Sequence, residues 1–396
     1  MPEAWAGRDA TAIIGTGNTD YSRASGRSVL TLATQASLAA IADAGLEPGD
    51  IDGIVRCDFD VVTHNDLANS LGITDLTFWA SNGPGGSAPS AMVGQAVGAL
   101  MSGQARNVLV YRSMNGRSGF RLGKGRLQAA SGPIGGNGTY EEFFVPYGLV
   151  SPGQMWAMLA RRHMHEYGTT EDQLGAIAIA CRDRANANPN AQMSDRPLTM
   201  DGYRASPMIS SPLRLVDYCL ETDGACAVVI TTADRAADRP KNPVYISAVT
   251  QAVIPDMQGG LASPVLMRPD PMLLPSTQVA AKLYERSGMG PEDIDVAQFY
   301  DCFTITVLVQ FEDYGFCKAG EGGPFAESGA IELGGSLPIN TSGGNMSDGY
   351  IHGMSHIVEG ARQLRGESTS QVAGAETCLV TSGLPITTSG LILRKG

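Results

Sequence analysis

Two short segments in the second half of the chain carry side chains that are able to move protons. Tyr300 and Cys302 lie within an apolar stretch, residues 299–305, that is typical of a strand. Tyr350 is followed by His352 and His356 where a helix is expected to begin. Phenol, thiol and imidazole groups act as general acids and bases when their surroundings adjust their pKa.

Each of these groups also has an ordinary structural interpretation. A lone tyrosine is usually buried for its packing, and a cysteine in an apolar strand is commonly an inert thiol. Asp301 lies between Tyr300 and Cys302. It is better suited to orienting the backbone or a neighbouring side chain than to reacting itself. The two histidines could polarise a carbonyl or support a phenol, and helix packing explains them equally well. The residue types alone therefore leave both interpretations open.

Glycines mark two further candidate contacts with a substrate. Gly343 and Gly344 would let backbone approach a ligand closely, because they have no side chain. Gly86 and Ser87 precede a helix of small residues, whose N-terminus could stabilise an oxyanion, although a simple tight turn explains them too. Gly383 is a weaker candidate for an oxyanion contact.

The composition bounds the class of protein. The chain has 396 residues, of which 43% are hydrophobic and 17% charged, so it can bury a large core. Its formal charge of −12 argues against a nucleic-acid partner, while a few local cations could still bind a phosphorylated small molecule. No apolar run is long enough to span a membrane and no signal peptide is evident, so we expect a cytoplasmic protein without membrane contact.

The cysteines argue against disulfides and zinc. The chain has seven, which is an odd number, and they lie far apart without a Cys-x-x-Cys pair. This pattern indicates free thiols, neither a disulfide framework nor a zinc site. We expect no metal site, and the Gly15-x-Gly17 pair is explained by a turn better than by a dinucleotide site, since the third glycine of that motif is missing.

The elements that must position the candidate residues occur twice. Residues 42–52 align with 285–295, with a glycine, a proline and Asp-Ile-Asp in matching places. In both copies we expect a helix to end at the glycine and a strand to begin after the second aspartate. Residues 86–103 and 350–366 each indicate a helix of small residues that precedes a strand. Such self-similarity predicts one α/β architecture built twice.

The duplication suggests a division of the chain. The first half spans residues 1–240 and the second half spans residues 241–396. Residues 113–211 differ in texture, with glycine-rich loops, aromatic residues and a helix expected at 154–167, so we interpret them as an insertion in the first half. The Gly, Met and aromatic residues of this insertion could line a wide apolar pocket.

Taken together, these features resemble the thiolase superfamily over nearly the whole chain. The chain is most similar to the sterol carrier protein X thiolases and the lipid-transfer-type aldolases related to them. The motifs that carry the resemblance are Met164-His165-Glu166-Tyr167-Gly168, Pro212 to Asp217, Asp223-Gly224-Ala225, Tyr300-Asp301-Cys302-Phe303, Asn340 to Gly344, and Gly349-Tyr350 through Leu364-Arg365-Gly366. The resemblance implies a five-layered αβαβα fold, usually dimeric, that acts on acyl-CoA thioesters.

The departures from the thiolase pattern define the expected chemistry. Thiolases place a nucleophilic cysteine where this chain has Gly86, and the nearest cysteine is Cys57. Two further catalytic positions, occupied in thiolases by His or Asn, are Tyr300 and Tyr350. Cys302, an acid/base group in sterol carrier protein X relatives, is kept. Because both tyrosines coincide with catalytic positions, we favour a functional role for them over packing alone.

Loss of the nucleophile with gain of tyrosine points to a carbon–carbon lyase. A thiolase transfers an acyl fragment to its nucleophile, whereas a retro-aldol cleavage of a 3-hydroxyacyl-CoA needs only an acid, a base and an oxyanion hole. The two tyrosines would serve if the site lowers the phenol pKa from roughly 10. The resemblance to aldolases of bacterial sterol side-chain degradation implies a steroid tail, with a ketone and a short acyl-CoA such as propionyl-CoA as products.

The site residues expected from this resemblance fall into two sets. The expected catalytic residues are Tyr300, Tyr350, Cys302 and His352, and the expected substrate-binding residues are Asp301, Gly86, Ser87, Gly343, Gly344 and His356. Two alternatives stay open: a thiolase or acyltransferase that uses Cys302 as its nucleophile, and a non-catalytic acyl-CoA-binding scaffold subunit.

The resemblance also implies partners. We expect a homodimeric core, coenzyme A only as part of the substrate with no cofactor bound by this chain, and a small acyl-CoA-binding partner built from a zinc ribbon and an OB fold. Arg161, Arg162 and His163 of the insertion helix could meet the phosphates of CoA, although a solvated helix face explains them better.

Overall fold

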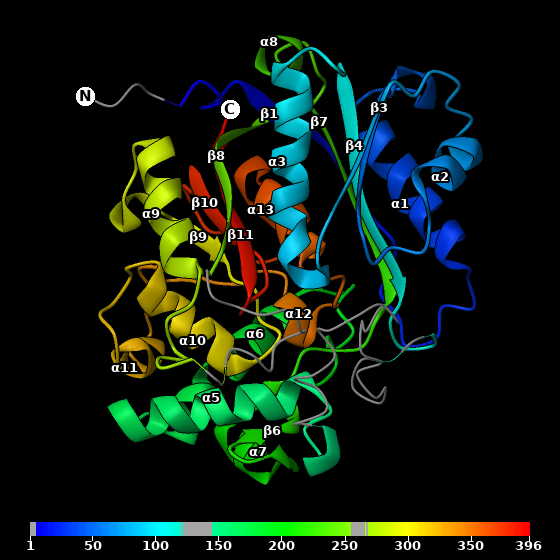
Figure 1. Cartoon of the computed structure of the whole chain (residues 1–396). Helices are drawn as coiled ribbons and strands as arrows, with labels where there is room; N and C mark the ends of the chain where they lie inside the picture. Colours follow the sequence, from blue (N-terminus) through cyan, green and yellow to red (C-terminus); the bar gives the residue numbers. More distant parts are fainter. Residues whose placement is uncertain (1–4, 120, 122–144, 255–265, 267) are drawn as a thin grey trace.

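The computed structural model describes residues 5–119, 121, 145–254, 266 and 268–396. Nine strands form one mixed sheet in the order β3-β2-β4-β7-β1-β8-β11-β10-β9 (Figure 1). Its strands are β1 Thr11–Asn18, β2 Gly53–Cys57, β3 Phe78–Asn82, β4 Asn107–Asn115, β7 Asp223–Thr232, β8 Val244–Val253, β9 Val296–Gln298, β10 Thr377–Thr381 and β11 Thr387–Lys395. The strands of each half of the chain are neighbours, so the sheet consists of two half-sheets.

The two half-sheets join over a short contact. β1 and β8 pair at only two positions, Ala12 with Tyr245 and Ile13 with Val244. By contrast, β1 pairs with β7, and β8 with β11, along most of their lengths. The expected boundary between residues 240 and 241 falls just before β8 and stays a prediction.

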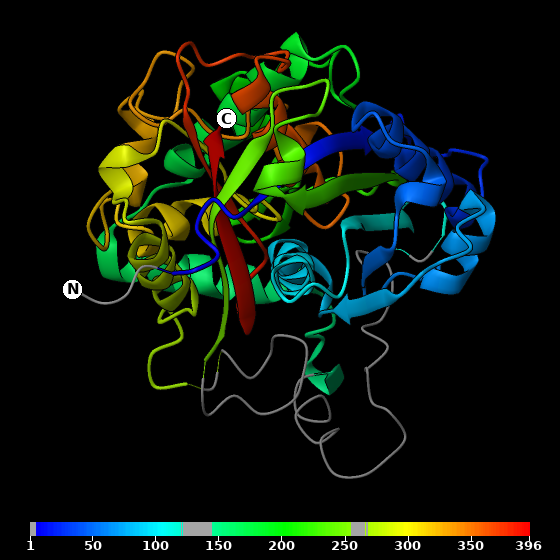
Figure 2. The ribbon, with the colours of Figure 1, turned by 90° about the horizontal axis from the view of Figure 1, so that it is seen from above.

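Helices and half-sheets alternate in five layers. Helix α1 (Val29–Asp43) packs on the outer face of the first half-sheet, and α9 (Ser276–Ser287) packs on the outer face of the second. Helices α3 (Ala88–Met101) and α13 (Met354–Arg365) lie between the half-sheets and share one apolar cluster with both. Figure 2, which views α3 nearly along its axis, shows strands of both halves around it. The expected αβαβα order is therefore observed, and the central helices are buried on nearly every side.

The remaining described α-helices are α2 (His64–Leu71), α5 (Pro152–Tyr167), α6 (Glu171–Ala187), α7 (Met200–Ala205), α8 (Ala233–Ala236), α10 (Thr304–Asp313), α11 (Gly322–Glu327) and α12 (Gly344–Ser347). Of these, α10, α11 and α12 all pack against α6 of the insertion. Among the described residues, every helix is too short or too polar to cross a bilayer.

The aligned segments of the two halves adopt the same local structure. Helix α1 ends next to Gly45, and α9 ends at Gly288, with φ of 65° and 69°. A single 3₁₀ turn follows each, at Pro48–Asp50 and at Pro291–Asp293, and then β2 or β9 begins. Left-handed glycines end helices because they carry no Cβ. The predicted duplication is thus confirmed at the level of individual turns.

One aspartate in each half performs the same structural role. The Asp52 carboxylate accepts hydrogen bonds from the backbone N–H groups of Arg106 and Asn107, at the start of β4. The Asp295 carboxylate accepts them from Glu376 and Thr377, at the start of β10. Each carboxylate therefore ties one strand to the parallel strand beside it.

The insertion contains α5, α6, α7 and a two-stranded sheet of β5 (Met208–Ser210) and β6 (Leu213–Arg214). The helix expected at 154–167 is α5, which begins two residues earlier. The sequence pattern did not predict α6, although it carries buried Leu174, Ile177 and Cys181 and packs against α10 and α12. Residues 122–144 of the expected insertion lie outside the described residues.

We expect Asp52→Ala and Asp295→Ala each to lower the free energy of unfolding by about 1–2 kcal/mol, because each substitution leaves two backbone donors without their charged acceptor. Thermal or urea unfolding followed by circular dichroism measures this loss. Asp195→Ala is the control, since its carboxylate is 83% exposed and, among the residues that the structure describes, pairs only with the neighbouring Arg196. An unchanged midpoint in both cap variants would contradict the duplicated role.

Candidate active site

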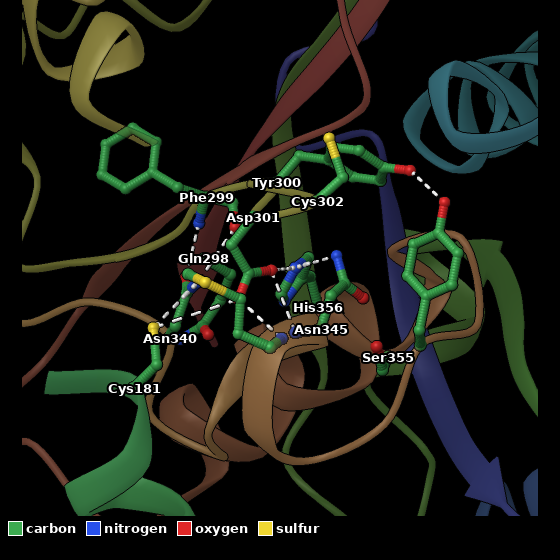
Figure 3. Close-up of polar contacts among 12 residues, drawn as sticks. Cys181, Gln298, Phe299, Tyr300, Asp301, Cys302, Asn340, Asn345, Ser355 and His356 are labelled. Carbon is green, nitrogen blue, oxygen red and sulfur yellow. Dashed lines mark hydrogen bonds and ion pairs between the residues drawn. The ribbon is translucent and has the colours of Figure 1, made fainter. Parts of the chain in front are cut away.

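The hydroxyl groups of Tyr300 and Tyr350 bond directly to each other. Their oxygens lie 2.8 Å apart, and the two rings meet edge to face with centroids 6.4 Å apart. Tyr300 is 3% exposed and Tyr350 is 9% exposed. Tyr300 comes from the loop after β9, and Tyr350 from the loop between α12 and α13. Figure 3 shows the Tyr300 hydroxyl and its hydrogen bond. The fold therefore brings together the two tyrosines predicted from the sequence.

The backbone of Tyr300 is fixed from two elements. Its N–H donates to Thr381 Oγ1 at the end of β10, over 2.8 Å. Its carbonyl accepts from Gln310 Nε2 of α10, over 2.9 Å. Because β9 and β10 are parallel neighbours, their carboxyl ends reach the same edge of the sheet. The phenol thus projects from a rigid base.

Tyr300 occupies the space that a side chain at position 86 would need. A Cβ atom built on Gly86 would lie 1.9 Å from Tyr300 Oη and 2.5 Å from Cζ. The carbonyl of Gly86 accepts a hydrogen bond from Gly383 N–H over 2.7 Å, which fixes this approach. The phenol hydroxyl therefore stands where the resemblance places a nucleophile.

Ser87 is held by its own neighbours. Its hydroxyl donates to the Pro84 carbonyl over 2.7 Å and accepts from Thr387 Oγ1 over 2.8 Å. Its N–H also donates to Pro84, within a 3₁₀ turn that leads into α3. Ser87 thus shapes the start of α3, and its predicted contact with substrate stays a prediction.

The expectation that the site lowers the phenol pKa is wrong for this structure. Burial raises the pKa of both Tyr300 and Tyr350 well above 10. The bond to Tyr350 adds to this rise at Tyr300, whereas the bond from Tyr300 and the positive charge of Arg112 oppose it at Tyr350. The physical reason is that both hydroxyls have exchanged water for each other, so neither anion is solvated. Both phenols are therefore protonated at neutral pH.

Cys302 is a buried thiol next to this pair. It is 8% exposed, its sulfur faces Thr306 Oγ1 at 3.8 Å, and burial raises its pKa to about 12. A nucleophilic cysteine must be a thiolate, so this environment disfavours Cys302 as a nucleophile. Its predicted acid/base role stays a prediction. Cys219, whose N–H donates to the Cys302 carbonyl, is half-buried here and was not predicted.

Asp301 organises the loop in front of α12. Its carboxylate accepts from the backbone N–H groups of Asn345 (2.9 Å) and Met346 (3.1 Å), and lies 2.9 Å from His356 Nε2 (Figure 3). Asp301 and His356 are both fully buried. Because these contacts are all within the protein, the geometry favours a positioning role for both residues over the predicted contact with substrate.

The two glycines of this loop meet protein atoms. A Cβ on Gly344 would lie 2.2 Å from Asp301 Oδ2, and one on Gly343 would lie 2.7 Å from the Cβ of Ala185 in α6. Both have positive φ, 65° and 111°. Close packing within the protein therefore explains why these positions are glycine, and their predicted contact with substrate stays a prediction.

His352 lies beside Tyr350 in an unusual backbone conformation. Its φ is 54°, which is rare for a residue with a side chain and costs about 1–3 kcal/mol unless its surroundings compensate. Its ring meets that of Tyr350 edge to face, with centroids 5.2 Å apart, and its Nδ1 lies 3.2 Å from Arg112 Nε. Arg112 in turn pairs with Asp60 over 3.1 Å. Neither Arg112 nor Asp60 was predicted, although a cation inside the apolar strand 107–113 was a signal.

The cations of α5 are occupied by other residues of the protein. His163 is fully buried between Thr169 and Glu312, at 2.7 and 3.2 Å. Arg162 pairs with Glu166, and Arg161 donates to Ser211. His163 is therefore a packing residue, which corrects the possibility that it meets CoA. Within the described part of the chain, no group of three or more potential ligands is arranged to hold a metal ion.

The chain matches a known family model and is similar to named proteins along most of its length. The family model described as "Thiolase C-terminal domain-like" matches residues 262–393. A protein of Mycobacterium tuberculosis named 17-hydroxy-3-oxo-4-pregnene-20-carboxyl-CoA lyase is 44% identical over 383 residues, which cover 96% of this chain and 98% of that protein. A steroid side-chain-cleaving aldolase of Thermomonospora curvata is 42% identical over 97% of both chains.

A solved structure is similar along the whole chain. It is titled "Ltp2-ChsH2(DUF35) aldolase" and superposes with a TM-score of 0.92 at 40% identity, over 98% of both chains. The agreement covers both half-sheets and the insertion, so the fold expected from the resemblance is confirmed.

We expect Gly86→Ala to displace Tyr300, because the added methyl would overlap the phenol. The free energy of unfolding should fall by about 1–3 kcal/mol, and a crystal structure of the variant should show the two tyrosine oxygens beyond hydrogen-bond distance. Gly49→Ala is the control, since nothing lies within 4 Å of a Cβ at that exposed glycine. A variant that keeps the 2.8 Å bond would show that the phenol does not depend on the missing side chain.

Proposed function

Because this chain belongs to the thiolase superfamily, and within it to the steroid side-chain-cleaving aldolases, we propose that it is a carbon–carbon lyase that cleaves a steroidal 3-hydroxyacyl-CoA by retro-aldol reaction. The observation that carries this proposal is the tyrosine hydroxyl pair, which fills the place of a nucleophile. Applied to the compound that names the Mycobacterium relative, the reaction breaks the C17–C20 bond and releases a 17-ketone and propionyl-CoA.

The raised pKa of both phenols favours a relay of neutral groups over a phenolate base. In this relay the Cβ hydroxyl gives its proton to Tyr350 as the Cα–Cβ bond breaks. Tyr350 passes its own proton to Tyr300, and Tyr300 protonates Cα of the departing enolate. The proton lost by the hydroxyl equals the one gained at Cα, so both tyrosines end as phenols.

The enolate oxygen needs stabilisation while the proton is in transit. His352, next to Tyr350, would donate from Nε2 to the thioester oxygen, and the start of α3 at Gly86 adds the positive end of a helix dipole. The proposed chemistry requires neither a metal nor a cofactor bound to the chain, and coenzyme A enters as part of the substrate.

The two alternatives find less support. Acyl transfer by Cys302 needs a thiolate, and the pKa of that thiol is about 12. A non-catalytic acyl-CoA-binding scaffold does not require two buried hydroxyls at the expected catalytic positions that, among the described residues, bond only to each other. The retro-aldol proposal accounts both for the protonated Cys302 thiol and for the paired hydroxyls.

We also propose that the chain works with a second protein. The similar aldolase structure is titled as a complex of Ltp2 with ChsH2(DUF35), and this chain aligns with one of its chains from end to end. A homodimeric core and a small acyl-CoA-binding partner with a zinc ribbon and an OB fold fit this parallel. The chain is acidic, with a formal charge of −12, so a partner that supplies cations would help it to bind the phosphates of CoA.

We expect Tyr300→Phe and Tyr350→Phe each to lower kcat by roughly 10²–10⁴-fold, the usual contribution of a general acid or base. Release of propionyl-CoA from the steroidal hydroxyacyl-CoA, without added CoA, is followed by mass spectrometry on the chain with its partner. Tyr284→Phe is the control, because within the described part of the chain its hydroxyl bonds only to the Tyr314 carbonyl. Cleavage of a straight-chain 3-ketoacyl-CoA instead of the steroidal substrate, and only with free CoA, would support the thiolase alternative.

The relay makes a prediction about exchange of the Cα protons. A relay can remove a proton from Cα of propionyl-CoA only when the ketone product is present to accept a proton at the other end. In D₂O we therefore expect deuterium at Cα with propionyl-CoA and the 17-ketone together, and none with propionyl-CoA alone. Exchange at the same rate without the ketone would show that one tyrosine acts as an independent base.

A further inference from the structure

A buried ion pair lies behind the tyrosine pair. Arg112 of β4 and Asp60, in the loop after β2, are each 4% exposed, and their side chains are 3.1 Å apart. Asp60 also accepts from the N–H (2.6 Å) and the hydroxyl (2.9 Å) of Ser113, and Arg112 donates to the Ser113 carbonyl. Burying two charges is costly even when they are paired, so the pair is poorly explained by stability alone.

The guanidinium of Arg112 determines the state of His352. Its Nε lies 3.2 Å from His352 Nδ1, and a guanidinium can only donate hydrogen bonds. Nδ1 must therefore accept, and the ring proton must sit on Nε2. Burial and the charge of Arg112 also lower the pKa of His352 well below 6.5, so the ring is neutral.

The backbone of His352 is arranged to bring this ring to the reacting pair. Its left-handed φ of 54° is a conformation that persists only where the surroundings impose it, and such residues concentrate at functional sites. The imposed position puts the ring edge to face with Tyr350. Among the described residues, Nε2 of His352 has no hydrogen-bond partner, so this donor is available to a ligand.

We propose that Arg112, braced by Asp60, is a positioning residue that fixes His352 as the neutral tautomer with its Nε2–H free to donate to the thioester oxygen. A neutral imidazole held in this way can polarise a carbonyl without gaining a proton. The donation from Nε2–H to the thioester oxygen rests on the proposed retro-aldol function, whereas the assignment of the His352 tautomer does not. Arg112 itself touches neither substrate nor tyrosine hydroxyl in this role.

The first test measures the tautomer and needs no turnover. The chain has five histidines, so ¹⁵N-histidine labelling gives few signals, and the His352 signal is identified by its loss in His352→Asn. Asparagine tolerates the left-handed conformation. In the unaltered protein we expect Nδ1 of His352 unprotonated and Nε2 protonated. In Asp60→Asn/Arg112→Met, which removes both charges together, we expect this fixed pattern to be lost.

The second test is a double-mutant cycle on the chain with its partner. We expect Arg112→Lys to lower kcat roughly ten- to a hundredfold with KM changed less than about twofold, and His352→Asn to lower it roughly 10²-fold. If Arg112 acts through His352, then the double variant is no slower than His352→Asn alone. Arg184→Lys is the control, a buried arginine of α6 paired with Glu332 outside the site.

The outcomes separate this proposal from the proposed function. A proton on His352 Nδ1, a tautomer unchanged in the double-charge variant, or fully additive losses of kcat would each overturn the role of Arg112 while leaving retro-aldol cleavage intact. Absence of cleavage by the unaltered complex would overturn the proposed function, and the labelled histidine would still report whether Arg112 fixes the tautomer.

Discussion

The site depends on two hydroxyl groups that have been removed from water together. A buried phenol without a partner costs several kcal/mol, and here each phenol satisfies the other over 2.8 Å. This bond holds only while the loop after β9 and the loop before α13 keep their relative positions. Asp301 fixes that relation, because its carboxylate binds the backbone of α12, which leads into the second loop, and the imidazole of His356 in α13.

The duplicated architecture explains why these loops meet. Each half presents the carboxyl ends of parallel strands and the start of a central helix toward the join, and the two halves then diverge in what they contribute. The second half supplies Tyr300 and Tyr350. The first half supplies Gly86, which leaves room for a phenol, and Arg112, which approaches His352 from β4. The site therefore combines two versions of one framework with different side chains.

Much of the framework could be predicted from the sequence, since turns are local. Gly45 and Gly288 marked both copies correctly because a left-handed glycine ends a helix within a few residues. The hydrogen bonds of Asp52 and Asp295 arise only in the fold, since their partners lie 54 and 81 residues further along the chain. The tyrosine pair followed from its positions in known motifs. The direction of the shift in the phenol pKa could not be predicted in this way, because it depends on burial by segments that are distant in the sequence. Arg112 and the packing of Gly344 against Asp301 likewise arise only in three dimensions.

The overlap of Gly86 with Tyr300 also constrains the history of this site. A cysteine at position 86 and a tyrosine at position 300 would occupy the same volume, so no folded ancestor held both in these positions. A lineage that began with the cysteine must have lost it before or together with the gain of the phenol. Stepwise replacement passes through a form with neither group. Conversion in either direction, by evolution or by protein engineering, therefore either changes both positions together or passes through a form that has neither group.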